Sequence, residues 1–202
     1  MDGQFLHILQ QKIADGLAAA PPPLTRRAVY VPAVPGKALA VIGMRRAGKT
    51  YFLRQCLADK LAAGEPRAAL LYFNFEDERL TGMQSVDLQY LLEAYYRLHP
   101  EWRDRQRVTF FLDEIQVVPG WETFVRRLLD SEQIDLFISG SSARLLSREV
   151  ATNMRGRGLK VLVHPFSFGE ALRHAHSEPG RPLAALPKSE RFDIEKRLHD
   201  YL

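Results

Sequence analysis

The feature that most constrains the fold is a glycine-bearing loop between a short apolar run and an amphipathic segment. The loop fits the pattern G-x-x-x-x-G-K-[ST] and reads Gly43-Met44-Arg45-Arg46-Ala47-Gly48-Lys49-Thr50. The residues before it, 38–42, are all apolar and predict a buried strand. After it, apolar residues recur at the spacing of one helical face, at Leu53, Cys56, Leu57 and Leu61. A strand, a glycine loop and a helix in this order predict a P-loop, the turn that binds the phosphates of a nucleoside triphosphate.

The residue types of this loop suit a bound triphosphate. Glycine leaves room for backbone N–H groups to converge on phosphate oxygens, and it permits a positive φ. The helix that starts at the loop adds the positive end of its dipole. Lys49 is predicted to reach the β- and γ-phosphates, and the Thr50 hydroxyl is predicted to bind Mg²⁺. We therefore expect residues 43–50 and the next residue, Tyr51, to form the nucleotide site.

The composition is that of a globular protein. The chain has 202 residues, 46% hydrophobic and 26% charged, which suits one sizeable domain with short extensions. Its single cysteine, Cys56, cannot form an internal disulfide, so we expect a reducing compartment, the cytoplasm. No apolar run approaches roughly 18 residues, and we expect no membrane association. The net charge of +4 permits contact with nucleic acid without requiring it.

Strand and helix patterns alternate along the chain. Further strands are predicted at 69–73, 108–112, 134–138 and 159–163. Besides the helix after the loop, helices are predicted at 4–19, 86–98, 119–130, 142–152 and 189–202, with Pro119 at or near the first turn of the third of these. Such alternation implies right-handed crossovers and an α/β fold, a five-stranded, mostly parallel sheet with helices on both faces.

The chain divides into three parts. Residues 1–23 form an amphipathic helix that ends at a proline triplet, and residues 24–176 form the P-loop domain. Residues 177–202 form a linker and the start of a further region. The last helical segment reaches the end of the sequence without a C-cap and with apolar residues still recurring, so we expect the chain to be a fragment of a longer protein.

A pair of acidic residues, Asp113 and Glu114, closes the third predicted strand. An apolar strand that ends in two acids is the Walker B pattern. Asp113 is expected in the Mg²⁺ shell, through water, because Mg²⁺ keeps much of its hydration. Glu114 is expected to orient or deprotonate the attacking water. Nucleotide kinases and GTPases usually lack this second acid, and the sequence has no Asn-Lys-x-Asp motif for guanine, so ATP hydrolysis is favoured.

The fourth predicted strand ends in serines, at Ser139-Gly140-Ser141-Ser142. Where this strand lies between the P-loop and Walker B strands, a polar residue at its end senses the γ-phosphate and helps to place the water. Ser139 is the first choice for this role and Ser141 the second. A serine as N-cap of the following helix fits Ser141 or Ser142 equally well, so both interpretations stay open.

A basic loop, Met154-Arg155-Gly156-Arg157-Gly158, precedes the fifth predicted strand. Arg155 or Arg157 could extend to the charge that develops on the phosphate, in cis or from a neighbouring subunit of a homo-oligomer. For each of them, a surface arginine without a role is the alternative. The segment 73–78 places an acidic cluster at the end of the second strand, which suits either a polar helix entry or a contact edge.

Taken in order, five segments resemble a family of prokaryotic AAA-superfamily ATPases with the loop G-x-R-R-x-G-K-T. They are 43–50, 72–77, 112–116, 139–142 and 155–157, and 165–170 resembles the family's segment after the fifth strand. The resemblance implies a sheet of order 5-1-4-3-2, with ATP and Mg²⁺ as ligands. It also implies that Lys49, Thr50, Asp113 and Glu114 have the roles given above. Similar proteins continue with a further C-terminal domain.

The leading functional hypothesis is an AAA-type core that binds and hydrolyses Mg·ATP. It would couple the nucleotide state to a conformational change in a partner or a further domain. One alternative is a small-molecule kinase that uses Arg155 and Arg157 as a lid, against which Glu114 argues. The other is a nucleotide-loaded switch that presents a surface to protein or DNA without hydrolysis.

Overall fold

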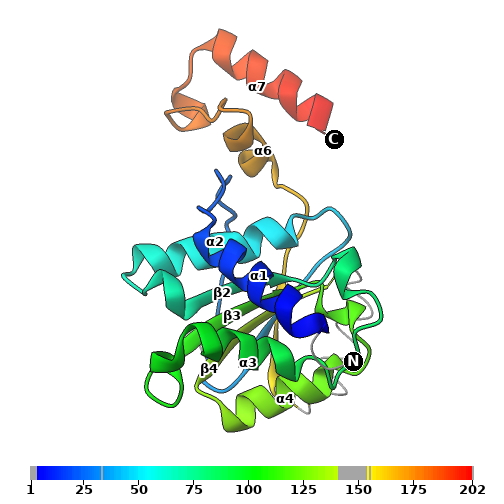
Figure 1. Cartoon of the computed structure of the whole chain (residues 1–202). Coiled ribbons are helices and arrows are strands. Elements are labelled where there is room, and N and C mark those ends of the chain that lie inside the picture. The colour runs from blue at the N-terminus through cyan, green and yellow to red at the C-terminus, as the bar shows by residue number, and fades with distance from the viewer. Residues whose placement is uncertain (1–3, 33, 141–153, 155, 202) are drawn as a thin grey trace.

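The computed structural model describes residues 4–32, 34–140, 154 and 156–201. The strands are β1 (Ala38–Ile42), β2 (Leu70–Asn74), β3 (Val108–Asp113), β4 (Ile134–Ser139) and β5 (Gly158–Leu162). The α-helices are α1 (Gln4–Ala18), α2 (Lys49–Ala62), α3 (Gln89–Leu98), α4 (Trp121–Ser131), α6 (Phe168–His174) and α7 (Lys188–Tyr201). Short 3₁₀ helices are η1 (Arg67–Ala69), η2 (Glu78–Leu80), η3 (Pro100–Trp102), η4 (Ile115–Val117) and η5 (Leu183–Ala185). Figure 1 shows their arrangement.

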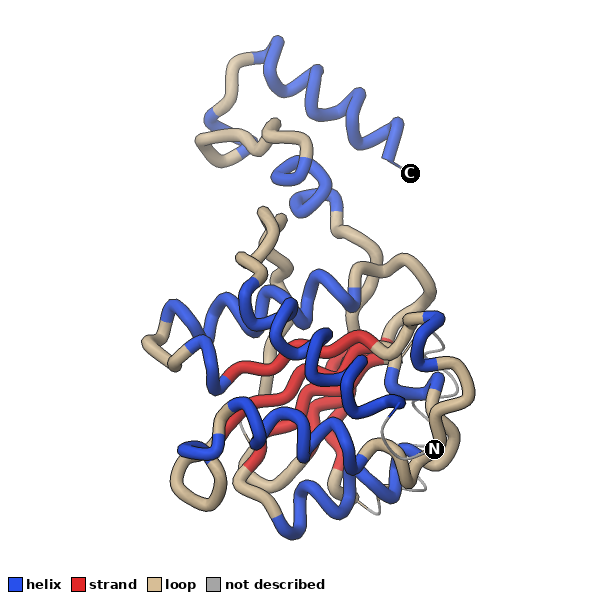
Figure 2. The backbone as a smooth tube through the Cα atoms, in the orientation of Figure 1, coloured by secondary structure: helices blue, strands red, loops and turns tan. Residues whose placement is uncertain are grey.

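The five strands lie together in one sheet (Figure 2). Their order is β2-β3-β4-β1-β5, and every neighbouring pair is parallel. This confirms the predicted fold class, the α/β fold of P-loop nucleotide-binding proteins. It also confirms the strand order 5-1-4-3-2, which is the same order listed from the opposite end of the sheet. Because the strands are parallel, all their carboxyl ends lie along one edge of the sheet. We call it the carboxyl edge, where β1, β3 and β4 end at Ile42, Asp113 and Ser139. The opposite, amino edge is where these strands begin.

Helices cover both faces of the sheet, as the long apolar strands predict. Successive strand residues point to opposite faces, so Ala40 packs with α1, α3 and α4, whereas Val41 packs with α2. Within α2, the predicted stripe is buried at Leu53, Cys56 and Leu57. The core is therefore two apolar layers, one on each side of the sheet.

The N-terminal helix α1 is part of this core. Leu9 and Ile13 are fully buried, and Phe5 and Leu17 pack against the same cluster. The helix lies against α3 and β2. Its predicted amphipathic face is therefore confirmed, and the proline triplet follows the helix after Ala18.

Two helices begin two or three residues later than the predicted starts. Gly120 is the N-cap of α4 with φ 73°, so Pro119 lies before the helix and not in its first turn. The left-handed backbone at Gly120 turns the chain before the helix begins, and glycine adopts it without steric cost. α3 begins at Gln89 and not at residue 86, because a turn in which the Gln84 N–H donates to Asp87 precedes it. The helix predicted at 142–152 lies outside the described residues.

The last two helices extend away from the sheet (Figure 1). α6 begins with a capping box, in which the Ser167 side chain accepts from the Glu170 N–H and the Glu170 side chain accepts from the Ser167 N–H. α7 has no buried residue, and Phe192 is 67% exposed. Its Arg191 donates to the carbonyls of Ala184 and Leu186, just before the helix. Near its end, the Tyr201 hydroxyl donates to the Phe166 carbonyl over 2.6 Å. None of the described helices combines the length and apolarity needed to cross a membrane.

Candidate nucleotide site

The glycine loop leaves β1 at the carboxyl edge, and two of its glycines are required by the backbone. A Cβ on Gly43 would lie 2.2 Å from the Val163 carbonyl oxygen. The approach is this close because the chain after β5 stays beside the chain after β1, and the Val163 N–H donates to the Ile42 carbonyl over 2.8 Å. Gly48, the N-cap of α2, has φ 90°, which a side chain would strain. The loop can therefore hold its turn only with glycine at both positions.

Lys49 is the first residue of α2, and its side chain folds back over the loop. Its Nζ donates to the carbonyls of Gly43 over 3.3 Å and Met44 over 3.0 Å, and the residue is only 6% exposed. Both acceptors are neutral, so these bonds do not neutralise the ammonium charge. The backbone N–H groups of the first turn, around Thr50, also lack intrahelical acceptors, as in every helix. The loop therefore presents a buried positive charge and a helix N-terminus at one place.

Asp113 ends β3 as a fully buried carboxylate. Its Oδ1 accepts from the Ser139 hydroxyl, and its Oδ2 accepts from the Tyr72 hydroxyl over 2.7 Å. Both donors are neutral hydroxyl groups on the strands that flank β3: Ser139 ends β4, and Tyr72 lies in the middle of β2. Burying a carboxylate lowers the stability of the fold unless a cation or a charged donor compensates its charge. The fold alone therefore gives no reason to place Asp113 here.

Glu114 and Ser139 meet beside this carboxylate. The Glu114 N–H donates to Ser139 Oγ over 3.3 Å, so one serine hydroxyl contacts both acidic residues. Glu114 has φ 55°, a left-handed backbone that costs on the order of 1 kcal/mol or more in a residue other than glycine. Its Oε2 accepts from the Gln116 side chain, which orients the carboxylate.

The strand register brings the loop and the acids together. Val41, two residues before Gly43, pairs with Ser139, and Leu112 pairs with Ile138. The ends of β1, β4 and β3 are therefore level with one another. Lys49, Thr50, Asp113, Glu114 and Ser139 all follow or end these strands at the carboxyl edge, as the sequence predicted.

The predicted arginine finger is not at this edge. The Arg157 carbonyl accepts from the N–H of Ala38, the first residue of β1, over 2.8 Å, and its side chain is paired with Asp130. β1 spans about 16 Å at roughly 3.3 Å per residue, so Arg157 lies at the opposite end of the sheet from the loop. An Arg157 finger in cis, or an Arg157 lid over the phosphates, is therefore wrong for this structure. Arg155 and Ser141 lie outside the described residues.

One family of known proteins matches most of this chain. The model of a family described as AAA domain matches residues 35–172, more than half of the chain. The chain belongs to this AAA domain family. The match includes the loop, both acids, Ser139 and the segment after β5. Family membership associates the chain with nucleotide binding and with ATPase chemistry.

Two relatives of this AAA domain are uncharacterised proteins. One, from Methanocaldococcus jannaschii, is 35% identical over 196 residues, which are 96% of this chain and 41% of the relative. The other, from Haemophilus influenzae, is 34% identical over 133 residues, which are 65% of this chain and 32% of the relative. The chain thus spans less than half the length of these relatives.

Tyr72 is a site residue that the sequence analysis did not single out. Burial, the charge of Asp113 and their hydrogen bond raise the pKa of this phenol, so it stays a donor to the carboxylate. The Arg54 guanidinium of α2 lies over its ring, 4.5 Å from the centroid. The contact between Tyr72 and Asp113 follows from the pairing of β2 with β3, in which Asn74 lies opposite Asp113. No local sequence pattern indicates this contact.

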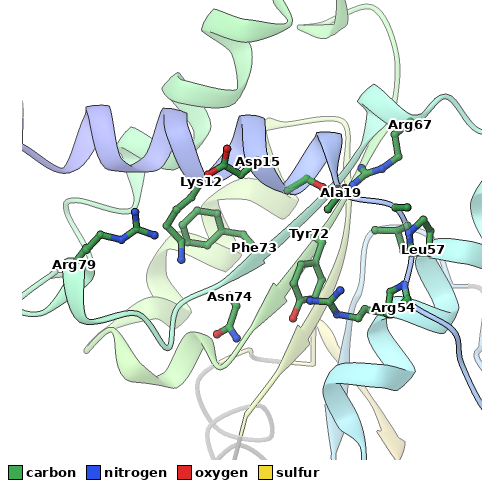
Figure 3. Close-up of a pocket in the computed structure, with 14 residues that line it drawn as sticks. Lys12, Asp15, Ala19, Arg54, Leu57, Arg67, Tyr72, Phe73, Asn74 and Arg79 are labelled. Carbon is green, nitrogen blue, oxygen red and sulfur yellow. Dashed lines mark hydrogen bonds between the residues drawn. The ribbon is translucent and has the colours of Figure 1, made fainter.

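A cavity of about 310 Å³, lined in part by Tyr72, lies between α1 and α2 (Figure 3). Lys12, Arg54, Arg67 and Arg79 line it together with Asp15 and Asn74. Beside it, Asp77 pairs with Lys12 and Arg79 and caps η2 by accepting from the Arg79 N–H. The cap at Asp77 therefore supports a polar helix entry, one of the two interpretations that the sequence left open for the acidic cluster.

The residues of the AAA domain fit a magnesium nucleotide. Within the described ranges, no group of three His, Cys, Asp or Glu side chains could hold a metal by itself. Mg²⁺ commonly takes one or two protein oxygens and completes its shell with water and substrate phosphates. The Thr50 hydroxyl and the Asp113 carboxylate are such oxygens, next to a loop built for phosphate. The site suits a metal that arrives with its nucleotide.

Proposed function

We propose that this AAA domain binds Mg·ATP and hydrolyses it, and that residues 24–176 are the catalytic unit. The observation that carries the proposal is the buried Asp113 carboxylate, held by Ser139 and Tyr72, at the same sheet edge as the Lys49 loop. A buried acid and a buried lysine that are not paired with each other are costly for folding. A bound magnesium triphosphate would compensate both charges.

The loop residues bind and orient the triphosphate. Backbone N–H groups of residues 43–51 and the dipole of α2 hold the phosphate oxygens. Lys49 exchanges its carbonyl acceptors, Gly43 and Met44, for the β- and γ-phosphates. Thr50 and Asp113 hold the metal, which supplies electrostatic stabilisation of the phosphate charge when bound.

Glu114 is the proposed base, and Ser139 is the proposed sensor. Glu114 accepts the proton of the attacking water or orients that water, the role of the corresponding residue in phosphoryl-transfer sites. The Ser139 hydroxyl touches both Asp113 and the Glu114 backbone, so a change at the phosphate can move the base through a single side chain.

An arginine finger from Arg157 requires a second copy of the chain. Arg157 lies at the amino edge, so only a neighbouring subunit could bring it to the phosphates of this one. We therefore include a homo-oligomer and a finger in trans in the proposal, with Arg155 as the other candidate. The kinase alternative gains no support, because the Arg157 side chain is paired with Asp130 far from the loop.

We propose that the nucleotide state is transmitted to the parts that the longer relatives carry beyond this region. The lone, buried Cys56 suits the reducing cytoplasm. Nucleic acid stays a possible partner on the basis of the net charge alone.

The test compares phosphate release and ATP binding in the wild type and in Glu114→Gln. We expect Glu114→Gln to bind ATP as the wild type does and to lose at least about 100-fold in turnover. Glu101→Gln, at an exposed glutamate in η3, is the matched control and should leave both unchanged.

The same measurements separate the alternatives. Tight ATP binding by the wild type without phosphate release, also with duplex DNA present, would favour the non-hydrolysing switch. ATP consumption that depends on an added acceptor would favour a kinase. Equal turnover by the wild type and Glu114→Gln would contradict the assignment of the base.

A further inference from the structure

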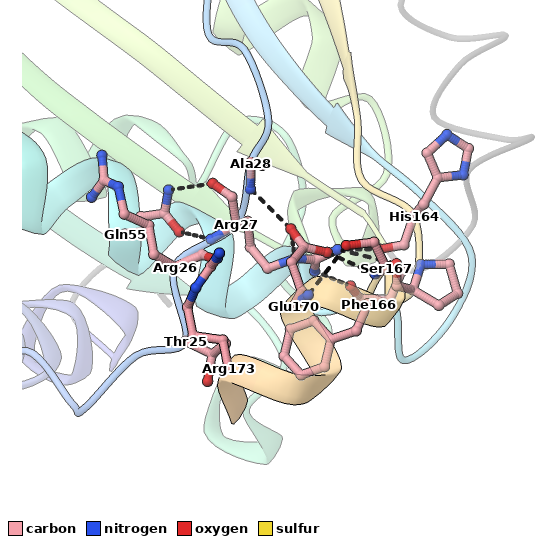
Figure 4. Close-up of polar contacts among 12 residues, drawn as sticks. Thr25, Arg26, Arg27, Ala28, Gln55, His164, Phe166, Ser167, Glu170 and Arg173 are labelled. Atoms are coloured by element: carbon pink, nitrogen blue, oxygen red, sulfur yellow. Dashed lines mark hydrogen bonds and ion pairs between the residues drawn. The ribbon is translucent and has the colours of Figure 1, made fainter. Parts of the chain in front are cut away.

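A buried arginine, Arg27, contacts the glycine loop, and Figure 4 shows it between Gln55 and Glu170. It belongs to the arm between α1 and β1 and is only 5% exposed. Its Nη1 donates to the Ala47 carbonyl of the loop over 2.8 Å. Its Nη2 donates to the His164 carbonyl over 2.5 Å and to the Pro165 carbonyl over 3.3 Å. One guanidinium therefore joins the loop after β1 to the chain after β5.

Glu170 completes this contact as a buried counter-charge. Its Oε1 accepts from Arg27 Nε over 3.1 Å and from the Ala28 N–H over 2.9 Å. Its Oε2 accepts from the Ser167 N–H over 2.8 Å, which closes the capping box of α6. Burial alone would raise the pKa of Glu170, but the N–H groups of Ser167 and Ala28 and the Arg27 guanidinium lower it to about 2. The pair is therefore ionised, and its polar atoms are largely satisfied within the protein.

The backbone of Arg27 is fixed as well. The Gln55 side chain of α2 accepts from the Arg27 N–H over 2.7 Å and donates to the Arg27 carbonyl over 3.1 Å. α2 is the helix that begins at the loop, so the arginine is held by the same element whose N-terminus faces the phosphates. A side chain anchored in this way can act as a rigid support.

The bond to Ala47 matters because of peptide geometry. The Ala47 carbonyl and the Gly48 N–H belong to one planar trans peptide unit and point in opposite directions. By holding the carbonyl outward, Arg27 directs the Gly48 N–H into the loop, where phosphate oxygens are expected. The two neighbours of Ala47, Arg46 with φ 65° and Gly48 with φ 90°, both have left-handed backbones. If this peptide unit rotated, a carbonyl oxygen would face the phosphates and repel them.

We infer that Arg27 is a positioning residue of the ATP site and that Glu170 keeps its guanidinium in place. The inference rests on the proposed function, in which the loop binds a nucleotide. The inference adds a route by which the segment after β5 acts on the loop. Any displacement of His164–Glu170 withdraws the support of the Ala47 carbonyl and lowers the affinity for the triphosphate.

The route continues to the last helix. The Phe166 ring lies against Arg27, with its centroid 4.8 Å from the guanidinium carbon. The Phe166 carbonyl accepts from the Tyr201 hydroxyl of α7, and the Tyr201 ring lies 5.6 Å from that of Phe168. A chain of direct contacts therefore leads from α7 through Phe166 and Arg27 to Ala47. Binding events at α7 can reach the loop along it, and nucleotide binding can reach α7 in return.

The experiment measures Mg·ATP affinity by calorimetry and the exchange of backbone amides in residues 43–52 by hydrogen–deuterium exchange. The variants are Arg27→Lys, which keeps the charge but cannot bond to three segments at once, and Glu170→Gln, which keeps the shape but loses the charge. Arg26→Lys is the matched control, because Arg26 is the exposed neighbour and pairs with Asp59 at the surface. All samples are held well below their melting temperatures.

We expect Arg27→Lys to weaken ATP binding by about 10-fold or more and Glu170→Gln by a smaller factor. Loss of one charge-assisted hydrogen bond changes affinity on this scale. The effects should not add in the double variant, because both act on one contact. Amide exchange in residues 43–52 should be faster in both variants without nucleotide, and Arg26→Lys should match the wild type in every measurement.

Wild-type ATP affinity and wild-type exchange in the loop of Glu170→Gln, together with a lower melting temperature, would overturn the inference and leave a purely structural pair. If Arg27→Lys does not fold, Glu170→Gln decides alone. If the wild type itself binds no ATP, the proposed function fails, and the exchange of residues 43–52 still decides whether Arg27 and Glu170 control the loop.

Discussion

The two edges of the sheet use similar residues in opposite ways. At the amino edge, Arg107 pairs with Asp135, and Arg157 pairs with Asp130, all four side chains being at least 37% exposed. At the carboxyl edge, Lys49 and Asp113 are buried, and each contacts neutral partners. Exposed pairs contribute little to stability and are easily replaced. Buried charges without a counter-charge lower stability, which indicates that the carboxyl edge is arranged for a ligand.

The largest expected effect is the difference in Mg·ATP affinity between alanine variants of a lysine at each edge. Lys49→Ala should weaken Mg·ATP binding by about 100-fold or more, because it removes charge-assisted bonds to two phosphates, each of about 1.5–3 kcal/mol. Lys37→Ala, just before β1 at the amino edge, should leave the affinity unchanged. Calorimetric titration with Mg·ATP measures both. Similar losses in the two variants would mean that overall charge, and not the loop, binds the nucleotide.

The aspartates of the two edges should separate activity from stability. Asp113→Asn is expected to reduce phosphate release by at least about 100-fold, since it removes a carboxylate from the metal site. Its melting temperature should stay the same or rise, because the amide is isosteric and leaves no buried charge. Asp135→Asn, on β4 at the amino edge, should keep wild-type turnover. A large loss of stability in Asp113→Asn would show that the carboxylate serves the fold.

The sequence predicted much of the carboxyl edge because its signals are local. Each apolar run ends in a polar residue, and the observed strand ends at Asp113 and Ser139 lie within one residue of the predicted ones. The strand order was implied by family resemblance and not by periodicity, which carries no information about which strands are neighbours. The spacing of Phe192 and Tyr201 predicted α7 but not its exposure, since periodicity shows an apolar face and not what covers it.

The contacts that the sequence did not predict join residues far apart in the chain. Arg27 and Glu170 are separated by 143 positions, and Tyr72 and Asp113 by 41. One local signal was available: Ser167-Phe168-Gly169-Glu170 fits a capping box and marks the start of α6. It does not show that the same glutamate also accepts from Arg27. Arg157 was placed near the phosphates because a basic loop precedes β5, but that position in a parallel strand is at the amino edge.

A smaller effect is expected when low pH protonates Glu170 in the first turn of α6. The pKa of Glu170 is about 2 in the folded chain, against an ordinary value of 4.5. Its contribution to the free energy of unfolding is therefore complete above pH 4.5 and is lost as the pH falls from about 4.5 to about 2, by an amount of about 3 kcal/mol. Urea unfolding of wild type and Glu170→Gln between pH 7 and pH 2.5 measures this. The difference between the two should shrink steadily below pH 4.5, and a constant difference would contradict the low pKa. Glu195→Gln, at an exposed position of α7, is the control and should unfold as the wild type does at every pH.

The smallest effect on stability is expected for Arg157→Ala at the amino edge. The ion pair with Asp130 is exposed, so its loss should lower the free energy of unfolding by no more than about 1 kcal/mol. Its effect on turnover depends on assembly. At protein concentrations where sedimentation shows a monomer, phosphate release should equal that of the wild type, because the side chain lies at the far end of its own sheet. At concentrations where copies associate, a finger in trans requires that Arg157→Ala release phosphate more slowly, and that mixing it with Lys49→Ala restore part of the rate. Equal rates for Arg157→Ala and wild type in the associated state would remove Arg157 from the catalytic proposal and leave the amino edge with no part in the chemistry.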